Sequence, residues 1–549
     1  MTPASSRSRT RTPRLQSAHV SDLALADRRR YIPASLRRLV VRLVPAPALS
    51  RLKRLAGSAA RIEQRWAQRV GNAAAMYKRR RASDAAGSRC TIVAVGPHTR
   101  VALIDDDLSG LNAREQNLQA VCSALADAGV DYFCVRGASD RSAVVGVSSE
   151  DRSRVLVALA GLCRRLPAYV SSVGARSESH RLRPGRSPRA WRTLRRAKVT
   201  RVTLYRTDRR GLLVQGSAYG CDVEFWERRG ERLVEPRPNL AAADVDASAP
   251  SIEAPPWMFT RLVSPHGRTT GHVRTRRELA LQMPDDIGFA IDMVYAWPTI
   301  TPSAHADGSE IRGSSDELLR YSLRALHMYA PWVRFVYVLV DELAPSWLEP
   351  SAPQLRLVQL RGLGGHCSQS SQEPDAEYLL NQIEGLSEFF VYVDHAAFFA
   401  TDVSPDLFFY GNGISKLPTW HPGEQRPNLG PHALRRDVLV ELAGTNPISS
   451  AHRPNITSQE QGSGTALRDQ DRAFATGRAA PADDLHRASV NLASRHIRRD
   501  IRRVTSERDH HVVALHGDHA NLPIDARNYL RHFLDASFPA PSPFERVSV

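Results

Sequence analysis

The sequence predicts an α/β protein whose centre is a mainly parallel sheet flanked by helices, between residues 291 and 411. Short apolar runs and helix-patterned segments follow one another there in the order strand, helix, strand, strand, helix, strand. Parallel strands need crossover connections, which helices usually supply, so this order favours a parallel sheet with helices on its faces. The chain has 549 residues, more than one ordinary core accommodates, which predicts two or three folded units.

The first half of this region contains a strand followed by a helix. Residues Ile291–Trp297 form an apolar run that Pro298 ends. Farther on, Ser314–Glu317 has the spacing of a capping box, in which two side chains satisfy the first backbone amides of a helix. Leucines three and four residues apart then mark one helix face, which ends before Pro331.

Three strands and a second helix complete the region. The expected strands are Phe335–Val340, Leu355–Leu360 and Phe389–Val393, all rich in apolar and β-branched residues. The expected helix begins at Pro374 and ends at Gly385, because proline fits the first helical turn and glycine fits the position after the last.

The residues that directly follow the first and last strands form the candidate site. Ligands of open α/β sheets bind in the crevice beyond the carboxyl ends of the strands. Asp394 and His395 follow the last strand of this region. A carboxylate can bind a metal ion and an imidazole can exchange a proton near neutral pH, so we expect chemistry at this pair.

The region before the central sheet is expected to form a smaller accessory α/β domain. Residues 101–104 and 132–135 resemble strands, and a helical pattern lies between them. Asp222 and Glu224 alternate with apolar residues, which places both carboxylates on one strand face. Such a pair can hold Mg²⁺, or it can form an ordinary polar strand face, which is the simpler interpretation. We expect a basic leader of residues 1–90, the accessory domain of residues 91–239, a linker of residues 240–284 and a larger domain of residues 285–549.

The positive charge of the chain is concentrated in the leader. The formal net charge is +18, and the residues through Cys90 contain 21 Lys and Arg against 4 Asp and Glu, which leaves +1 for the rest. Nucleic acid is therefore not expected as a partner of the folded body. Residues 36–81 combine arginines with leucine, isoleucine and tryptophan. Such segments can contact an anionic membrane surface, pack on their own domain or dock to nucleic acid.

Two further features favour the cytoplasm. No window approaches the ~18 apolar residues of a membrane span, and the N-terminus lacks the apolar run of a signal peptide. The six cysteines form no CxxC pair, as is common in a reducing compartment. We therefore expect a cytoplasmic protein. A further expectation is that residues 36–81 contact the inner face of the membrane peripherally.

Seven short runs match the motifs of one bacterial family. They are Ile291–Trp297, Asp316–Arg324, Ala330–Arg334, Pro345–Leu348, Gly385–Phe390, Pro405–Phe409 and Pro431–Leu439. These runs resemble the Stealth proteins, which are exopolysaccharide phosphotransferases. The C-terminal run Phe538–Glu545 and the accessory region resemble bacterial members as well, so the resemblance covers most of the chain after about Thr91.

The resemblance implies a reaction and a set of residues. A sugar 1-phosphate passes from a nucleotide-sugar donor to a hydroxyl of a glycan acceptor, with Mg²⁺ or Mn²⁺ as the cofactor. Charge develops on phosphoryl oxygens in this step, so cations and a general base are required. The resemblance implies catalytic roles for His432, Arg435 and Arg436 and substrate-binding roles for Asp292, Arg324, Glu377 and Arg453. Asp394 and His395 are the expected catalytic substitutes at the family's acidic motif, and Asp394 with the nearby Asp307 is the expected metal site.

The sequence departs from the family pattern at its acidic positions. Thr299 stands where the family has an aspartate after the first strand, Asp394-His395-Ala396 stands for Asn-Asp-Asp, and Leu515-His516-Gly517 stands for Leu-Asn-Asp. A lost charge-stabilising group typically costs about 10²–10³ in rate. Two alternatives therefore stay open. One is a catalytically impaired paralogue that acts as a binding or partner subunit in a homo- or hetero-oligomer, and the other is a protein that docks to membrane or nucleic acid through its leader.

Overall fold

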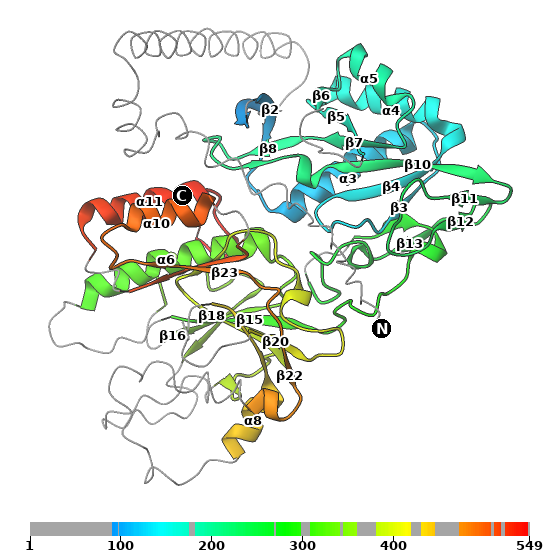
Figure 1. Cartoon of the computed structure of the whole chain (residues 1–549). Coiled ribbons are helices and arrows are strands. Elements are labelled where there is room, and N and C mark those ends of the chain that lie inside the picture. The colour runs from blue at the N-terminus through cyan, green and yellow to red at the C-terminus, as the bar shows by residue number, and fades with distance from the viewer. Residues whose placement is uncertain are drawn as a thin grey trace, which may run out of the picture.

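The α/β class expected from the sequence is confirmed by the computed structural model. The structure describes residues 90–96, 98–174, 182–267, 271–297, 308–340, 344–359, 380–418, 430–444, 472–506, 510–517 and 522–546. Strands and helices from the earlier and later parts of the chain form neighbouring groups in Figure 1. Within the described ranges, no helix combines the length and the apolar character that crossing a membrane requires.

The later part of the chain is built on a sheet whose strands are mostly parallel. In spatial order the strands are β17 (Leu355–Gln359), β16 (Val336–Val340), β15 (Ile291–Ala296), β18 (Phe389–Asp394) and β21 (His432–Arg435). β15 pairs in parallel with β16 and β18, β16 pairs in parallel with β17, and β21 pairs with β18 in the antiparallel sense. The carboxyl ends of β15, β16, β17 and β18 therefore meet at one edge of the sheet.

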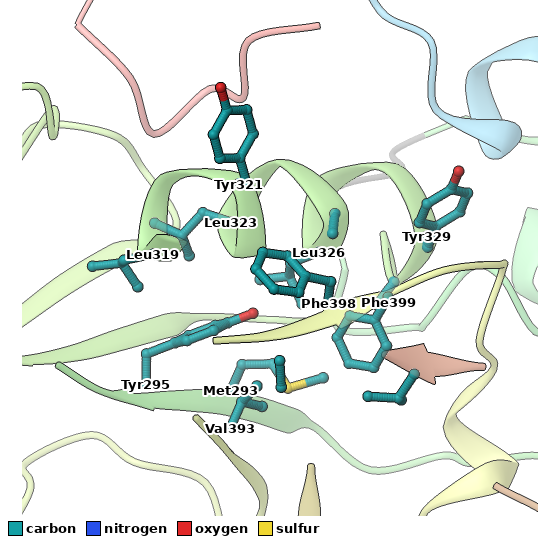
Figure 2. Close-up of a cluster of buried hydrophobic side chains, with 14 of the residues drawn as sticks. Met293, Tyr295, Leu319, Tyr321, Leu323, Leu326, Tyr329, Val393, Phe398 and Phe399 are labelled. Carbon is teal, nitrogen blue, oxygen red and sulfur yellow. The ribbon is translucent and has the colours of Figure 1, made fainter. Parts of the chain in front are cut away.

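Helix α6 (Gly308–Tyr329) covers one face of this sheet. Its leucines at positions 319, 323 and 326 are buried, because a spacing of three and four residues places them on one side of the helix. Figure 2 shows these side chains above Met293 and Tyr295 of β15, both fully buried. The helix ends at Tyr329, as the following Pro331 predicts, but it begins six residues before the expected capping serine at position 314.

A second, smaller sheet continues directly from the central one. In spatial order it contains β19 (Ala397–Phe399), β24 (Val512–His516) and β23 (Arg487–Asn491). Helix α10 (Ile497–Ser506) connects β23 to β24, α11 (Ile524–Ser537) follows β24, and both helices lie beside α6 in Figure 1. Three short elements, β20 (Ser415–Leu417), β22 (Ala479–Pro481) and α8 (Arg436–Gly444), lie at the other end of this part.

The earlier part of the chain is a separate arrangement of mixed sheets. Strands β1 (Cys90–Val95), β2 (His98–Ile104), β8 (Tyr205–Thr207) and β9 (Val214–Gln215) form one sheet. A second sheet contains β12 (Asp244–Asp246), β11 (Arg232–Val234), β10 (Cys221–Arg229), β7 (Val199–Thr203), β5 (Tyr169–Ser172) and β6 (Arg183–Pro184), with β4 (Ala143–Ser148) on β10 and β3 (Tyr132–Val135) on β4. The helices of this part are α3 (Gly110–Asp127), α4 (Arg152–Arg165) and α5 (Pro188–Leu194).

The structure bears on two sequence interpretations of this earlier part: it agrees with a polar strand face at Asp222 and Glu224, and it corrects the expected linker. Asp222 and Glu224 are buried and paired with arginines, since Arg237 contacts Asp222 at 2.7 Å and Glu224 at 2.6 Å, and Arg201 contacts Asp222 at 2.6 Å. The two carboxylates therefore form a polar strand face whose charge is neutralised by arginines inside the fold. The segment expected as a linker contains β12 and the hairpin of β13 (Ile252–Ala254) and β14 (Val273–Thr275), so much of it is folded.

Candidate functional site at the carboxyl edge

The candidate site lies where β15 and β18 end, which we call the carboxyl edge and define by Trp297, Asp394 and His395. Asp394 is the last residue of β18 and pairs in register with Ala296 of β15. Its Oδ1 accepts a hydrogen bond from the backbone N–H of Ala396 at 2.7 Å, which fixes the turn into β19. The Nδ1 atom of His395 lies 3.4 Å from the same Oδ1.

Burial sets the protonation of this pair. The Asp394 side chain keeps 39% of its surface exposed, whereas His395 keeps 14%. Burial lowers the pKa of His395, and the attraction of the neighbouring Asp394 carboxylate opposes this effect only in part. The imidazole is therefore neutral at neutral pH and can accept a proton, while the carboxylate remains open to solvent or to a ligand.

His432 lies at the start of β21, next to the strand that carries Asp394. It pairs in register with Tyr392, two residues before Asp394. Burial and the positive charge of Arg487 lower the pKa of His432 to about 4, so this imidazole is also neutral at neutral pH. Arg487 is held beside it, because its Nη2 donates to the carbonyl oxygen of Pro431 at 3.1 Å.

Arg487 is a candidate anion contact that sequence reasoning missed. Its Nη1 donates to the carbonyl oxygen of Leu485 at 3.2 Å, and burial lowers its pKa to about 10. Its Nε is buried without a hydrogen-bond partner in the ranges that the structure describes. A side chain on Gly430 would meet that Nε at 3.1 Å, and the φ of +156° at this residue also favours glycine. Arginine is so common in this chain that no sequence signal singled this residue out.

Other buried polar atoms lie at the carboxyl edge without a partner. The indole Nε1 of Trp297 and the Nδ1 of His516 make no hydrogen bond within the described residues. The N–H of Leu515 donates to the carbonyl oxygen of Ala396 at 3.0 Å, which brings the end of β24 against the turn after His395. Buried polar groups are nearly always hydrogen-bonded in folded proteins, so these atoms are candidates for ligand contacts.

Arg435 and Arg436 lie at the opposite end of β18. Because β21 is antiparallel, Arg435 pairs with Phe389, five residues and roughly 16 Å along the strand from Asp394. Arg435 binds Asp437 at 2.8 Å, and Arg436 donates to the carbonyl oxygen of Asn381 at 2.8 Å. The prediction that these arginines share a site with Asp394 is therefore corrected, since the direction of β21 separates them.

Asp292 and Arg324 are positioned within the fold and away from the carboxyl edge. Asp292 is the second residue of β15, where Arg334 donates to it at 2.6 Å and the N–H of Ser387 at 2.8 Å. Arg324 of α6 binds Glu545 near the C-terminus through two hydrogen bonds of 2.7 Å each. These contacts give both residues structural partners and do not favour the expected substrate-binding roles.

The remaining expected site residues, Asp307, Glu377 and Arg453, lie outside the described residues. In the part of the chain that the structure describes, His, Cys, Asp and Glu side chains form no group of three or more that could hold a metal ion. Mg²⁺ prefers a near-octahedral set of oxygen ligands, and Asp394 with His395 supplies one carboxylate and one imidazole. These described residues alone therefore do not fit a complete site for Mg²⁺ or Mn²⁺.

The fold and the carboxyl edge define an α/β protein with polar side chains at the carboxyl ends of its parallel strands. A family model described as Stealth protein CR2, conserved region 2, matches residues 312–417. Two exopolysaccharide phosphotransferases of Streptomyces coelicolor are 30% and 33% identical to the chain, over 94% and 95% of its length and 97% of theirs. The chain therefore belongs to the Stealth family of exopolysaccharide phosphotransferases, which confirms the resemblance seen in its motifs.

More distant similarities extend to other organisms and to solved structures. The exopolysaccharide phosphotransferase CpsY of Mycobacterium tuberculosis is 23% identical over 82% of this chain and 91% of its own length. The crystal structure of the galactosyltransferase LgtC aligns with 47% of this chain and 97% of that chain, at 13% identity and a TM-score of 0.26. A structural likeness this weak supports no conclusion about the chain.

Proposed function

We propose that the chain transfers a sugar 1-phosphate from a nucleotide-sugar to a hydroxyl of an exopolysaccharide acceptor. The observation that carries this proposal is the Asp394–His395 pair at the end of β18, inside residues 312–417 that match the Stealth model. The chain's similarity to named exopolysaccharide phosphotransferases over nearly its whole length supports the substrate class.

His395 acts as the general base in this proposal. The acceptor hydroxyl loses its proton to the imidazole as its oxygen attacks the phosphorus next to the sugar. The bond between that phosphorus and the bridging oxygen breaks, and a nucleoside monophosphate leaves with the electron pair. The product is a phosphodiester between the sugar and the acceptor, and the proton on His395 passes to solvent.

The neighbouring residues orient this base and offset charge. Asp394 lies 3.4 Å from the Nδ1 of His395, so it favours the ring tautomer and orientation in which Nε2 can take the proton. Neutral His432 begins the adjacent strand β21. Arg487, the first residue of β23, donates to the carbonyl oxygen of Pro431 just before it, so a phosphoryl group entering beyond β18 would meet a buried cation. Preorganised cations at developing negative charge are usually a large part of catalysis.

That Asp394 and Asp307 together bind Mg²⁺ or Mn²⁺ remains a prediction. We also propose that residues 91–239 are an accessory domain and that the protein works in the cytoplasm. Contact of residues 36–81 with the inner face of the membrane and assembly into an oligomer extend this proposal. None of these assignments changes the step assigned to His395.

A matched pair of variants tests the proposed base. We expect His395→Gln to lower the transfer rate by about 10²–10⁴, the range of general-base catalysis, while the Kd for UDP-N-acetylglucosamine measured by calorimetry stays within about twofold. His98→Gln, a change of an exposed histidine in the earlier part of the chain, should leave both quantities unchanged. Equal rates for the His395 variant and the wild type would remove this residue from the mechanism.

The impaired-paralogue alternative rests on one sequence feature, the replacement of the family's acidic positions by Thr299, His395, Ala396 and Gly517. It predicts calorimetric binding of a nucleotide-sugar by the wild-type chain without release of any nucleotide, with or without added Mg²⁺ or Mn²⁺. Turnover by the wild-type chain would exclude this alternative.

A further inference from the structure

Helix α10 has an apolar side and an arginine side. Ile497, Ile501 and Val504 are buried, and their spacing of four and three residues places them on one face of the helix. The ten residues of α10 also contain four arginines and one aspartate, a net charge of +3. All four arginines are exposed, because they occupy the positions on the opposite side of the helix.

Helix α11 holds part of this arginine side in place. The guanidinium of Arg498 lies 5.5 Å from the centre of the Tyr529 ring, and the Nη2 of Arg498 donates to the carbonyl oxygen of Asp525 at 3.3 Å. The Nε of Arg502 donates to the Tyr529 hydroxyl at 3.2 Å. Arg498 and Arg502 are one helical turn apart, about 6 Å along the axis, so Tyr529 fixes two cations in a row.

Neighbouring residues extend the row into a surface. We define the arginine face as the exposed residues Arg498, Arg499, Arg502 and Arg503 of α10, together with Arg495 just before the helix. Among the acidic groups nearby, Asp500 accepts a hydrogen bond from the Ser494 hydroxyl at 2.7 Å, which turns its carboxylate toward its own helix start. Five arginines on and just before one helix favour an anionic ligand.

The arginine face lies close to the carboxyl edge. The N–H of Leu492 donates to the carbonyl oxygen of His516 at 2.8 Å, and the N–H of Leu515 donates to that of Ala396 at 3.0 Å. The end of β23 and the turn after His395 thus flank the same end of β24. Only three residues separate Asn491, the end of β23, from Arg495, so the arginine face begins within about 14 Å of chain from that end.

We propose that the arginine face binds a glycan that carries phosphodiester groups and guides it to the carboxyl edge. This proposal rests on the proposed function, because that reaction adds one phosphodiester, and hence one negative charge, to the acceptor at each transfer. A membrane surface is the other anionic partner to consider. The apolar side of α10 is buried in the core, however, so it cannot insert among lipid chains as membrane-bound amphipathic helices do.

Direct binding tests the proposal without requiring catalysis. The probe is a synthetic oligosaccharide of about six phosphodiester-linked sugars, compared with an uncharged oligosaccharide of equal length. We expect Arg499→Gln combined with Arg503→Gln to weaken binding of the charged probe about tenfold, as expected when two exposed charge contacts are lost. The affinity of the wild type should fall as salt rises, because a bound polyanion releases counterions.

The control is Arg192→Gln combined with Arg196→Gln, which removes the same charge from exposed positions in the earlier part of the chain. We expect it to retain wild-type affinity. Equal losses in the two double variants, or equal binding of the uncharged oligosaccharide, would overturn the proposal. Binding of phosphatidylglycerol vesicles through the arginine face without binding of the charged probe would also overturn it. If the charged probe binds as expected but no transfer is detected, the proposed function is rejected and the binding role of the arginine face still stands.

Discussion

At the scale of single residues, the sequence predicts where the carboxyl edge lies but not all of the residues that lie there. Asp394 and His395 were found because they directly follow an apolar strand, and strand ends are where α/β sheets bind ligands. Arg435 was expected beside them because it follows His432 in one motif. The motif gives no indication that β21 runs antiparallel, and this direction carries Arg435 to the other end of β18.

His432 should make the folded protein sensitive to acid. Its pKa is lowered to about 4, whereas an unfolded histidine titrates near 6.5. Between these values the unfolded chain binds a proton that the folded chain does not, so stability is lost as the pH falls from about 6.5 toward 4. A difference of this size corresponds to roughly 3 kcal/mol.

Thermal unfolding at several pH values measures this effect. We predict that the Tm of the wild type falls more steeply between pH 6.5 and 5 than the Tm of His432→Gln, because the variant lacks the titrating group. The exposed-site variant His98→Gln should keep the wild-type slope. Parallel slopes for the wild type and His432→Gln would show that this histidine does not control the acid response.

At the scale of elements, the sequence predicts the strands of the central sheet better than its remaining parts. The expected runs at 335–340 and 389–393 match β16 and β18 to within one residue at each end, because buried strands are continuous apolar runs. Residues 374–379 of the helix expected from Pro374 to Gly385 lie outside the described residues, and residues 381–385 form turns instead of the last helical turn, so the expected end at Gly385 is wrong. The hairpin of β13 and β14 was missed, since its residues combine loop-like composition with pairing that depends on the packed fold.

The C-terminal segment is fixed to α6 by one buried carboxylate. Glu545 keeps 2% of its side-chain surface exposed and accepts two hydrogen bonds from Arg324. Burial alone would raise the pKa of Glu545, but Arg324, Arg320 and the backbone N–H of Ser542 together lower it below its ordinary value. Arg320 also contacts this carboxylate, at 2.5 Å. The Stealth-like motif arginine thus anchors the chain end to the central helix.

Glu545→Gln should therefore destabilise the fold. We predict a loss of about 2–4 kcal/mol in the free energy of unfolding, because removal of one partner leaves buried arginine charge without its carboxylate. Urea unfolding measures the loss, and Glu384→Gln, at an exposed position, should leave the stability within about 0.5 kcal/mol of the wild type. Similar unfolding midpoints for both variants would contradict the anchoring role.

At the scale of the whole molecule, the earlier and later parts of the chain are joined by charged contacts. Asp402, which follows β19, binds Arg141 at 2.7 Å and accepts a hydrogen bond from the Tyr219 hydroxyl at 2.7 Å. Burial raises the pKa of Asp402 even though Arg141 opposes this effect. Arg136 and Asp286 add a buried bidentate pair, at 2.7 and 2.6 Å. The sequence did not predict these contacts between the earlier and later parts, because the paired residues are about 150 to 260 positions apart and no local pattern links them.

Asp402→Ala should loosen this contact and expose the strand that follows the carboxyl edge. We predict at least tenfold faster amide hydrogen exchange in β19, because local opening is controlled by such packing and charge contacts. Asp484→Ala, which alters an exposed carboxylate that binds Lys416 at 2.8 Å, is the matched control and should leave exchange in β19 unchanged. Unchanged protection of β19 in the Asp402 variant would show that the two parts dock independently of this residue.

The identity of the nucleotide released during turnover tests the central proposal most directly. The purified chain is incubated with UDP-N-acetylglucosamine and a glycan acceptor, and the products are followed by phosphorus NMR. Transfer of a sugar 1-phosphate predicts UMP and a new phosphodiester signal in equal amounts. Release of UDP without a phosphodiester would show transfer of the sugar alone, and that result would contradict the reaction proposed for this site.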